Sequence, residues 1–349
     1  MDAFFASVEE RDHPRFAGRP IVVGSDPEDG RGRGVVSTAN YAARAYGIHS
    51  AQPISTAWRL AEAARAKGLP SAVFVAPDMK RYGAVSRAIM EVLREHAEHV
   101  EEASVDEAYL DLSFSGSYEK AEEMARSIKE DIRSREYLTA SVGIGSNKLV
   151  AKIASDRHKP DGLTVVRPDE AEKFLELLPV RAIPGVGPKM EEELKRLGAR
   201  TVADARRFTE AELYGMFGKW GNELYAKLRG TYDAPLVEEW EAKSIGEQET
   251  FMRDTRDPSV LQERLMALAD GVHAHFKKSG LASFRGVTIT VRFADFTTKT
   301  RSMTLAAPAS DAGTVRFEAL RLFMPFLDKR GNPQRKPVRL VGVRVEKLQ

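Results

Sequence analysis

The chain of 349 residues contains no cysteine, which excludes disulfide bonds and every metal site built on thiolate ligands. A bound metal ion would have to be held by oxygen or histidine ligands. The chain also lacks an apolar run near the roughly 20 residues that a membrane-spanning helix needs. Its start, "MDAFFASVEERD", reaches acidic residues at once and has no basic segment, unlike a signal peptide. We therefore expect a cytoplasmic protein without a membrane partner.

Charge is unevenly spread along the chain. Hydrophobic residues make up 42% and charged residues 30%, which fits a globular protein, and the length of 349 residues favours two or three domains. The net charge is only +2, but residues 244–349 hold 18 Lys and Arg against 11 Asp and Glu, a net of +7, which leaves −5 for residues 1–243. A basic third on an acidic body favours a polyanionic partner, although a solvated basic surface would have the same composition.

Apolar periodicity predicts the order of the elements. Residues 1–10 are typical of a strand that runs into a helix, and an α/β pattern continues to about residue 165. The spacing of Val85, Ile89, Val92 and Leu93 predicts one buried face on a long helix. Short helices are predicted from about 166 to 230. Beyond an acidic segment without periodicity, the pattern predicts an α+β domain with an antiparallel sheet and a helix over residues 310–327.

The segment "EEASVDEAYLDLS", residues 101–113, places Asp106 and Glu107 side by side among β-formers. Neighbouring residues of a regular strand point to opposite faces, so one acid would face the core, where an unpaired charge is costly. Two interpretations remain open on the segment alone. Either this is a surface strand with Glu107 outward and Asp106 at a bend, or it is a hairpin whose tip aims both acids at a metal ion.

Two further segments carry cations suited to a phosphorylated substrate. "GIGSNKLVAKIASDRHKPDG", residues 143–162, groups Lys148, Lys152 and Lys159 around a strand–helix junction. "STANYAARAYG" places Tyr41 and Arg44 three residues apart, on one helix face. Arginine often binds phosphate with two hydrogen bonds, but each of these segments would also be typical of a solvated helix surface.

The segment "IPGVGPKMEEELKRLG", residues 183–198, is a Gly-x-Gly turn that opens an amphipathic helix. Backbone N–H groups at a helix start bind anions, and this helix-hairpin-helix pattern grips a DNA phosphate without reading sequence. The alternative is an ordinary glycine turn between helices. We expect Gly185, Val186, Gly187 and Lys189 to contact a DNA phosphate.

Together, the motifs resemble one family. "MDAFFASVEERDHP", "VVSTANYAARAYGI", "ASVDEAYLDLS", "VGIGSNKLVAKIASDRHKPDG" and "IPGVGP" occur in the order and spacing of Y-family DNA polymerases, and look most like the DNA polymerase IV branch. The resemblance covers essentially the whole chain. It implies a right-hand polymerase of α/β and α+β domains: a palm (residues 1–10 and 78–165), fingers (11–77), a helical thumb with the helix-hairpin-helix motif (166–230), a linker (231–243) and an α+β little finger (244–349).

The resemblance also implies an activity. The chain would be a template-directed, low-fidelity translesion DNA polymerase that adds deoxynucleotides to a primer 3′-end by two-metal-ion catalysis. It would use two Mg²⁺ ions, with Mn²⁺ as a substitute. Asp106 and Glu107 would be the catalytic carboxylates and metal ligands, together with the backbone carbonyl of Met1. This favours the hairpin interpretation of residues 101–113.

Residue by residue, the resemblance implies a nucleotide site and partners. Phe5 would be the steric gate that excludes a ribose 2′-hydroxyl, and Phe4 would belong to the core. The incoming triphosphate would be held by Thr38, Tyr41, Arg44 and Lys159. Primer–template DNA and deoxynucleoside triphosphates would be the partners of a monomer without proofreading. Family members often carry a C-terminal sliding-clamp motif, so a clamp would bind through a tail not present in this sequence.

One position departs from the family pattern. The first family motif is Asp-x-Asp, and Met1 and Asp2 match its second and third positions, so its first metal-ligating Asp is not in the sequence. We expect a polypeptide that starts at Met1 to extend primers slowly. An alternative is a catalytically impaired relative that only binds primer–template DNA. A two-metal nucleotide cyclase is a further alternative, but it would need neither the helix-hairpin-helix motif nor a basic C-terminal domain.

Overall fold

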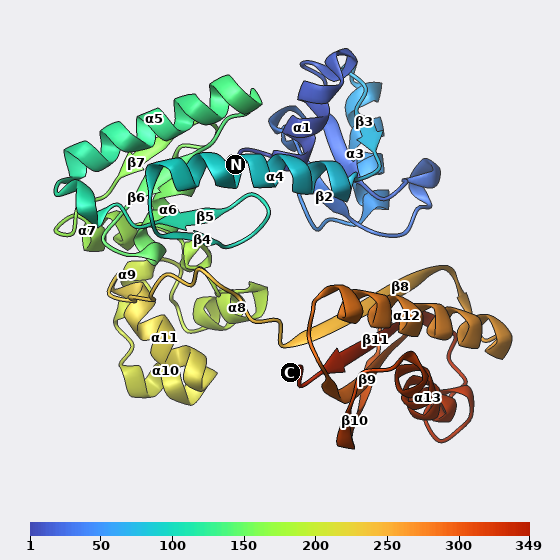
Figure 1. The fold of residues 1–349 in the computed structure, drawn as a ribbon. Helices are drawn as coiled ribbons and strands as arrows, with labels where there is room; N and C mark the ends of the chain where they lie inside the picture. Colours follow the sequence, from blue (N-terminus) through green and yellow to red (C-terminus); the bar gives the residue numbers. More distant parts are fainter. The chain divides into compact units, whose positions relative to one another are not determined.

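In the computed structural model, residues 1–349 form two compact units, residues 1–239 and residues 240–349 (Figure 1). The first unit contains four hydrophobic clusters, and a single large cluster fills the second. No helix combines the length and the apolar character needed to span a bilayer. Each unit therefore folds around buried apolar side chains of its own.

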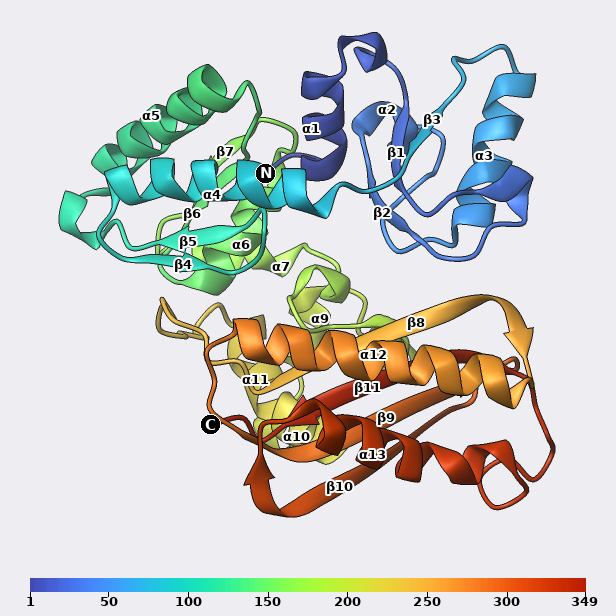
Figure 2. The same ribbon diagram turned by 45° about the vertical axis from the view of Figure 1, so that its right-hand side comes forward.

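The first unit begins with a three-stranded sheet in which β1 lies between β2 and β3 (Figure 2). Strand β1 is antiparallel to β2 and parallel to β3. The Asn40 side chain accepts hydrogen bonds from the backbone N–H groups of Ile21 and Ala43, so it fixes the start of α2 against β1. The elements are α1 (Phe4–Asp12), η1 (Pro14–Phe16), β1 (Ile21–Gly24), η2 (Glu28–Gly30), β2 (Val36–Ala39), α2 (Tyr41–Arg44), α3 (Ile54–Ala66) and β3 (Val73–Val75).

The strand predicted at the start of the chain is not formed. Residues 1–3 precede α1 and belong to no strand. They are held instead by Asp2, whose buried carboxylate accepts hydrogen bonds from Ser141 Oγ at 2.7 Å and from the Asp161 N–H at 2.8 Å. The Asp2 N–H donates to the Thr139 carbonyl at 3.2 Å. A buried charge is tolerated here because donors surround it.

Two separate strand pairs follow, β4 with β5 and β6 with β7. Helix α4 starts at the N-cap Asp78, and its buried side chains include Val85, Ile89, Val92 and Leu93, as the periodicity predicted. These side chains pack in one cluster with Ile128 and Ile132 of α5. The elements are α4 (Met79–His96), β4 (Val100–Glu102), β5 (Ala108–Leu110), η3 (Ser113–Ser115), α5 (Tyr118–Glu136), β6 (Val142–Ile144), α6 (Lys148–Arg157) and β7 (Leu163–Val165).

Short helices complete the first unit, as predicted. Two of them begin with capping boxes, in which the N-cap threonine and an acid three residues later satisfy each other's backbone N–H groups. Residues 231–243 form neither helix nor strand. The elements are α7 (Ala171–Glu176), η4 (Val180–Ala182), α8 (Pro188–Arg196), α9 (Val202–Arg206), α10 (Glu210–Phe217) and α11 (Lys219–Leu228).

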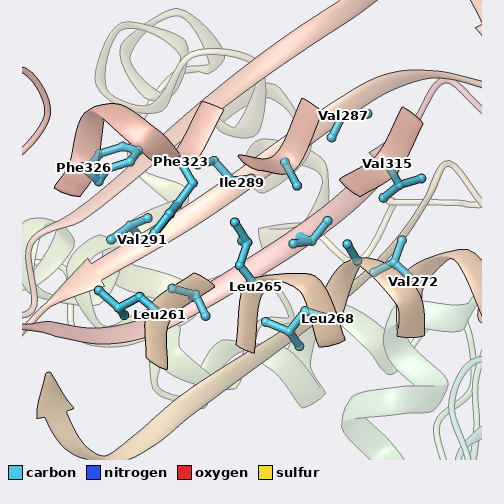
Figure 3. Packing of buried hydrophobic residues seen from close by; sticks show 14 of the residues in the cluster. Leu261, Leu265, Leu268, Val272, Val287, Ile289, Val291, Val315, Phe323 and Phe326 are labelled. Carbon is cyan, nitrogen blue, oxygen red and sulfur yellow. The ribbon is translucent and has the colours of Figure 1, made fainter. Parts of the chain in front are cut away.

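The second unit is the predicted α+β domain, an antiparallel sheet in the order β10-β9-β11-β8. Side chains of α12, α13 and β9 meet in its core (Figure 3). The helix predicted over residues 310–327 ends at Phe323, and a 3₁₀ turn with Pro325, which has no N–H to donate, completes it. The elements are β8 (Ser244–Thr255), α12 (Pro258–Lys278), β9 (Phe284–Phe293), β10 (Thr298–Ala309), α13 (Ala312–Phe323), η5 (Met324–Leu327) and β11 (Val338–Glu346).

Candidate active site

The two adjacent acids lie at the tip of a hairpin. Strands β4 and β5 pair from Val100 with Leu110 to Glu102 with Ala108, which leaves residues 103–107 as the connecting loop. The N–H groups of Ala103 and Ser104 both donate to the Glu107 carbonyl, at 3.0 and 3.1 Å, and close this loop. Asp106 and Glu107 are both partly exposed. Because they lie outside the ladder, neither acid has to face the core.

One cavity of about 300 Å³ brings most of the predicted site residues together. It is lined by segments that lie far apart in the sequence: the chain start, β2 and α2, the hairpin tip, and the turn after α6. The predicted residues that line it are Met1, Phe5, Thr38, Tyr41, Arg44, Asp106 and Lys159. Ala3, Phe4, Ser37 and Ser50 complete the lining. Phe4 is otherwise a core residue, as expected, with an exposed fraction of 2%.

Helix α2 supplies a cation and an unsatisfied hydroxyl. The Arg44 guanidinium lies 4.6 Å from the centre of the Tyr41 ring, and its Nε donates to the Ala39 carbonyl at 2.9 Å. The Tyr41 hydroxyl is buried and has no hydrogen-bond partner. Burial raises the pKa of Tyr41, so the hydroxyl keeps its proton as a donor. Buried polar groups are normally hydrogen-bonded, so this one is suited to a ligand oxygen.

Cations and acids alternate beside the cavity. Glu107 pairs with Lys152 of α6, Lys152 lies 3.6 Å from Asp156, and Asp156 pairs with Lys159 at 2.7 Å. Of the three lysines grouped by the sequence, only Lys159 lines the cavity. Lys148 pairs with the buried Glu101 instead. Glu107 therefore does not line the cavity itself, and its carboxylate forms an ion pair with Lys152 beside it.

The Phe5 ring has a rigid support. It stacks on the Tyr82 ring of α4 with centroids 4.3 Å apart and planes 14° from parallel. Tyr82 is fully buried, and its hydroxyl donates to Glu9 Oε1 at 2.6 Å. The buried Tyr82 ring blocks movement of the Phe5 ring in that direction, so Phe5 forms a wall of the cavity.

The oxygen atoms at the hairpin tip fit a hard divalent cation. Asp106 accepts one hydrogen bond from Ser104 Oγ at 3.0 Å and is partly exposed, so its remaining lone pairs are accessible. The structure contains no group of three or more His, Asp or Glu side chains that would hold a metal ion. Asp2 is committed to Ser141 and Asp161. A cation here would complete its coordination with substrate phosphates and water, as Mg²⁺ commonly does.

Comparisons with known proteins agree along the whole chain. The impB/mucB/samB family matches residues 1–156, the thumb domain of DNA polymerase-iota matches residues 181–231, and the impB/mucB/samB family C-terminal domain matches residues 242–349. DNA polymerase IV of Methanoculleus marisnigri is 45% identical over all of this chain and 93% of its own length. DNA polymerase IV 2 of Methanosarcina mazei is also 45% identical, over all of this chain and 90% of its own.

The solved structures that resemble this chain are also DNA polymerases. A Y-family DNA polymerase chimera, Dbh-Dpo4(243-245)-Dbh, has a TM-score of 0.86 and 31% identity over 99% of this chain and 97% of its own. An insertion ternary complex of Dbh DNA polymerase has a TM-score of 0.66 and 31% identity, over 99% of this chain and 96% of its own. The chain belongs to the Y-family DNA polymerases, in the DNA polymerase IV branch.

The predicted right-hand polymerase fold is thus confirmed, and the chain is a translesion DNA polymerase. The nucleotide cyclase alternative is wrong, and the alternative of a relative that only binds DNA is not favoured.

The glycine turn of the polymerase lies in the helical part of the first unit, at the start of α8. Gly185 has a φ of 98°, which glycine adopts without strain, and Gly187 is the N-cap residue. The Val186 N–H already donates to the Ile183 carbonyl at 3.0 Å, and its side chain is buried in the core. The Val186 N–H is therefore used within the turn and Lys189 is exposed beside it, and the contact of Gly185, Val186, Gly187 and Lys189 with a DNA phosphate stays a prediction.

Sequence reasoning missed several residues around the site. Nothing local to the sequence indicates that Ser50 lines the cavity or that Tyr82 supports Phe5. It also missed Glu101, whose carboxylate accepts the Val237 N–H at 2.8 Å and pairs with Lys148, which in turn donates to the Pro235 carbonyl at 3.1 Å. These bonds attach residues 235–237 to the base of the β4–β5 hairpin.

Glu101→Ala should release this segment. The substitution removes the buried carboxylate that accepts from the Val237 N–H and pairs with Lys148. Loss of such charged hydrogen bonds costs about 1.5 kcal/mol or more, so the population in which residues 235–237 are detached should increase about tenfold. Chymotrypsin cleavage after Leu236, followed by mass spectrometry under native conditions, measures the opening. Glu102→Ala is the control, because Glu102 pairs with Arg94. Equal cleavage in both variants would show that Glu101 does not hold the segment.

Proposed function

We propose that the chain catalyses attack of a primer 3′-hydroxyl on the α-phosphate of a deoxynucleoside triphosphate, directed by a template strand. The observation that carries this proposal is the cavity that gathers Asp106, Phe5, Tyr41, Arg44 and Lys159. An acid, an aromatic wall and two cations meet there, as a nucleotide with a sugar and a triphosphate requires. In this proposal residues 1–10 and 78–165 serve as palm, 11–77 as fingers, 166–230 as thumb, 231–243 as linker and 244–349 as little finger.

Four side chains would hold the triphosphate. Arg44 uses its Nε in a bond to the backbone, so its terminal nitrogens are the donors left for phosphate oxygens. Lys159 adds a second cation, and binding would exchange its Asp156 partner for phosphate. The Tyr41 hydroxyl gains the acceptor that it lacks in the protein alone. Thr38 lines the same cavity from β2.

Two Mg²⁺ ions, or Mn²⁺ in their place, would be held by Asp106, Glu107 and the backbone carbonyl of Met1. When bound, such a metal pair stabilises charge on the attacking and the leaving oxygen. The protein side chains bind and orient the substrate around them. Glu107 is tied to Lys152 by an ion pair, so Glu107 becomes a full ligand only when that pair is exchanged or shared.

Primer–template DNA would be held at two places. The turn at Gly185 and Gly187, with Lys189, suits a phosphate at the start of α8. In the second unit, β9 turns Val287, Ile289 and Val291 into the core, so its intervening residues lie on the opposite face of the sheet. That face carries the exposed or partly exposed residues Thr290, Arg292, Ser302, Thr304 and Arg344, whereas Thr288 is buried and donates its hydroxyl to Ser302. Hydroxyl and guanidinium groups on an open sheet suit a phosphate backbone.

We propose that the chain acts as a monomer, and that any sliding clamp binds elsewhere than on these two surfaces.

Replacing either tip acid should abolish nucleotide insertion and leave DNA affinity within a few-fold. Asp106→Ala and Glu107→Gln remove charge at the reacting centre, which should slow insertion by a factor of about 10² or more. Phosphate contacts supply most of the affinity, and the acids make none. Single-turnover insertion and primer–template binding are measured together, with Glu102→Ala in the same hairpin as control. Parallel loss of binding and insertion would refute the assignment.

Phe5→Ala should admit ribonucleotides. Truncating the ring opens space on the Tyr82 surface without removing a polar contact, so discrimination between sugars should fall by at least about tenfold, or about 1.4 kcal/mol. Single-nucleotide insertion of matched ribo- and deoxyribonucleotides measures the ratio. Phe114→Ala, which truncates an exposed ring on η3, is the control. A ratio equal to that of the parent would make Phe5 a packing residue only.

Arg292→Gln combined with Arg344→Gln should flatten the salt dependence of DNA binding. Each lost phosphate contact lowers the slope of log affinity against log salt by about 0.9, so two contacts lower it by about 1.8. Arg316→Gln with Arg321→Gln is the control at equal net charge, because α13 packs on the opposite, core-facing side of the sheet. If both pairs of substitutions change the slope equally, the sheet face does not bind DNA.

A further inference from the structure

A buried ammonium group lies beside the glycine turn at the start of α8. Lys227 of α11 is 9% exposed, and its Nζ lies 4.7 Å from the centre of the Tyr232 ring and 5.7 Å from that of the Trp220 ring. It also pairs with Glu223, one helical turn earlier, at 3.3 Å. A methionine of similar length would fill this space without the cost of burying a charge, which an ion pair often fails to offset. The ammonium group therefore indicates a polar task.

That task is to hold a backbone carbonyl of the turn. Lys227 Nζ donates to the Pro184 carbonyl at 3.3 Å, and a Cβ added to Gly185 would lie 3.5 Å from the same nitrogen. A second cation, Arg181, donates from its Nη1 to the Val186 carbonyl. Two carbonyl groups of one short turn thus point at two side-chain cations.

These two bonds fix the direction of two N–H groups. The peptide bonds after Pro184 and Val186 are trans, so each carbonyl is antiparallel to the N–H of the glycine that follows it. Because both carbonyls point at cations, the N–H groups of Gly185 and Gly187 point away from those cations, and neither has an acceptor in the protein. The N–H between them, on Val186, donates to the Ile183 carbonyl within the turn.

Lys227 also favours one of two turn types. The bond from the Val186 N–H to the Ile183 carbonyl closes a β-turn whose third residue, Gly185, has a φ of 98°, as a type II turn requires. In a type I turn, the peptide group between Pro184 and Gly185 is rotated by about 150°, so its N–H points the other way. A donor at the Pro184 carbonyl stabilises the type II form and keeps the Gly185 N–H directed away from Lys227.

We propose that Lys227 and Arg181 are positioning residues that hold the N–H groups of Gly185 and Gly187 ready for one phosphate of the DNA backbone. Neither cation contacts the phosphate, and each acts through the carbonyl that it holds. The two N–H groups donate charge-assisted hydrogen bonds, and they need no rearrangement when DNA arrives. The inference rests on the proposed contact between this turn and DNA, and it adds the residues that prepare the turn.

The test is a double-mutant cycle between the full chain and primer–template DNA that carries a single uncharged methylphosphonate. The methylphosphonate is moved along the backbone one position at a time, and affinity is measured at constant salt. Lys227→Met and Arg181→Met each remove one carbonyl donor. Arg196→Met is the control at equal net charge, because Arg196 lies at the far end of α8 and pairs with Glu193. Thermal unfolding of each variant is measured in parallel.

In the parent, a methylphosphonate at the phosphate bound by the turn should weaken binding by at least about tenfold, because the hydrogen bonds there lose their charged acceptor. In Lys227→Met and in Arg181→Met, the effect at this position should fall to about threefold or less. Arg196→Met should keep the full effect, and Arg181→Lys, which restores a cationic donor, should recover part of it. Undiminished sensitivity in both methionine variants would overturn the proposal, even if their melting temperatures fall.

Lys189→Gln separates this inference from the proposed contact itself, because Lys189 is exposed beside the turn. If the effect at this position falls in Lys189→Gln but not in Lys227→Met or Arg181→Met, the turn binds the phosphate without help from the two cations, and the proposal is wrong. If no position responds in the parent, the proposed contact between the turn and DNA is wrong as well. Arg181 is exposed, so Arg181→Met tests the proposal even if Lys227→Met does not fold.

Discussion

Two adjacent carboxylates can serve one cleft only where the backbone leaves the strand conformation, and the loop at residues 103–107 is that place. The ladder between β4 and β5 stops at Glu102 and Ala108, and two N–H groups close the loop on the Glu107 carbonyl. Asp106 therefore lines the cavity, and Glu107 forms an ion pair with Lys152 of α6. Without this loop, one acid would be buried without a partner.

The rest of the cavity depends on buried polar groups that join distant segments. Asp2 joins the chain start to Ser141 and to the turn at Asp161, and Phe5 and Lys159, which follow and precede these segments, line the same cavity. Asn40 ties α2 to β1, and with it Tyr41 and Arg44. Each carboxylate or amide satisfies two donors at once, so its loss would leave both unsatisfied in the interior.

The sequence predicted what local patterns and motifs encode. The spacing of Val85 and Ile89 located α4, and the motif around Asp106 located the hairpin. Pairings between distant residues carry no local period, which is why the partners of Asp2, Glu101 and Tyr82 were not predicted. Lys148 and Lys152 show the same limit: their positions suggested a phosphate, yet their partners are Glu101 and Glu107. Within residues 1–10 the expected helix formed but the strand expected before it did not, because strand pairing also depends on distant segments.

The central claim is that residues 37–44, Asp106 and Lys159 form one triphosphate site. A deoxynucleoside triphosphate with a photoreactive group on its γ-phosphate, bound with Mg²⁺ and primer–template DNA, tests it most directly, because binding is read out without turnover. The account predicts that mass spectrometry finds the label on Lys159 or within residues 37–44, and that unlabelled deoxynucleotide matched to the template competes it away. Labelling elsewhere on the chain, or labelling of these residues that matched nucleotide does not reduce, would contradict it.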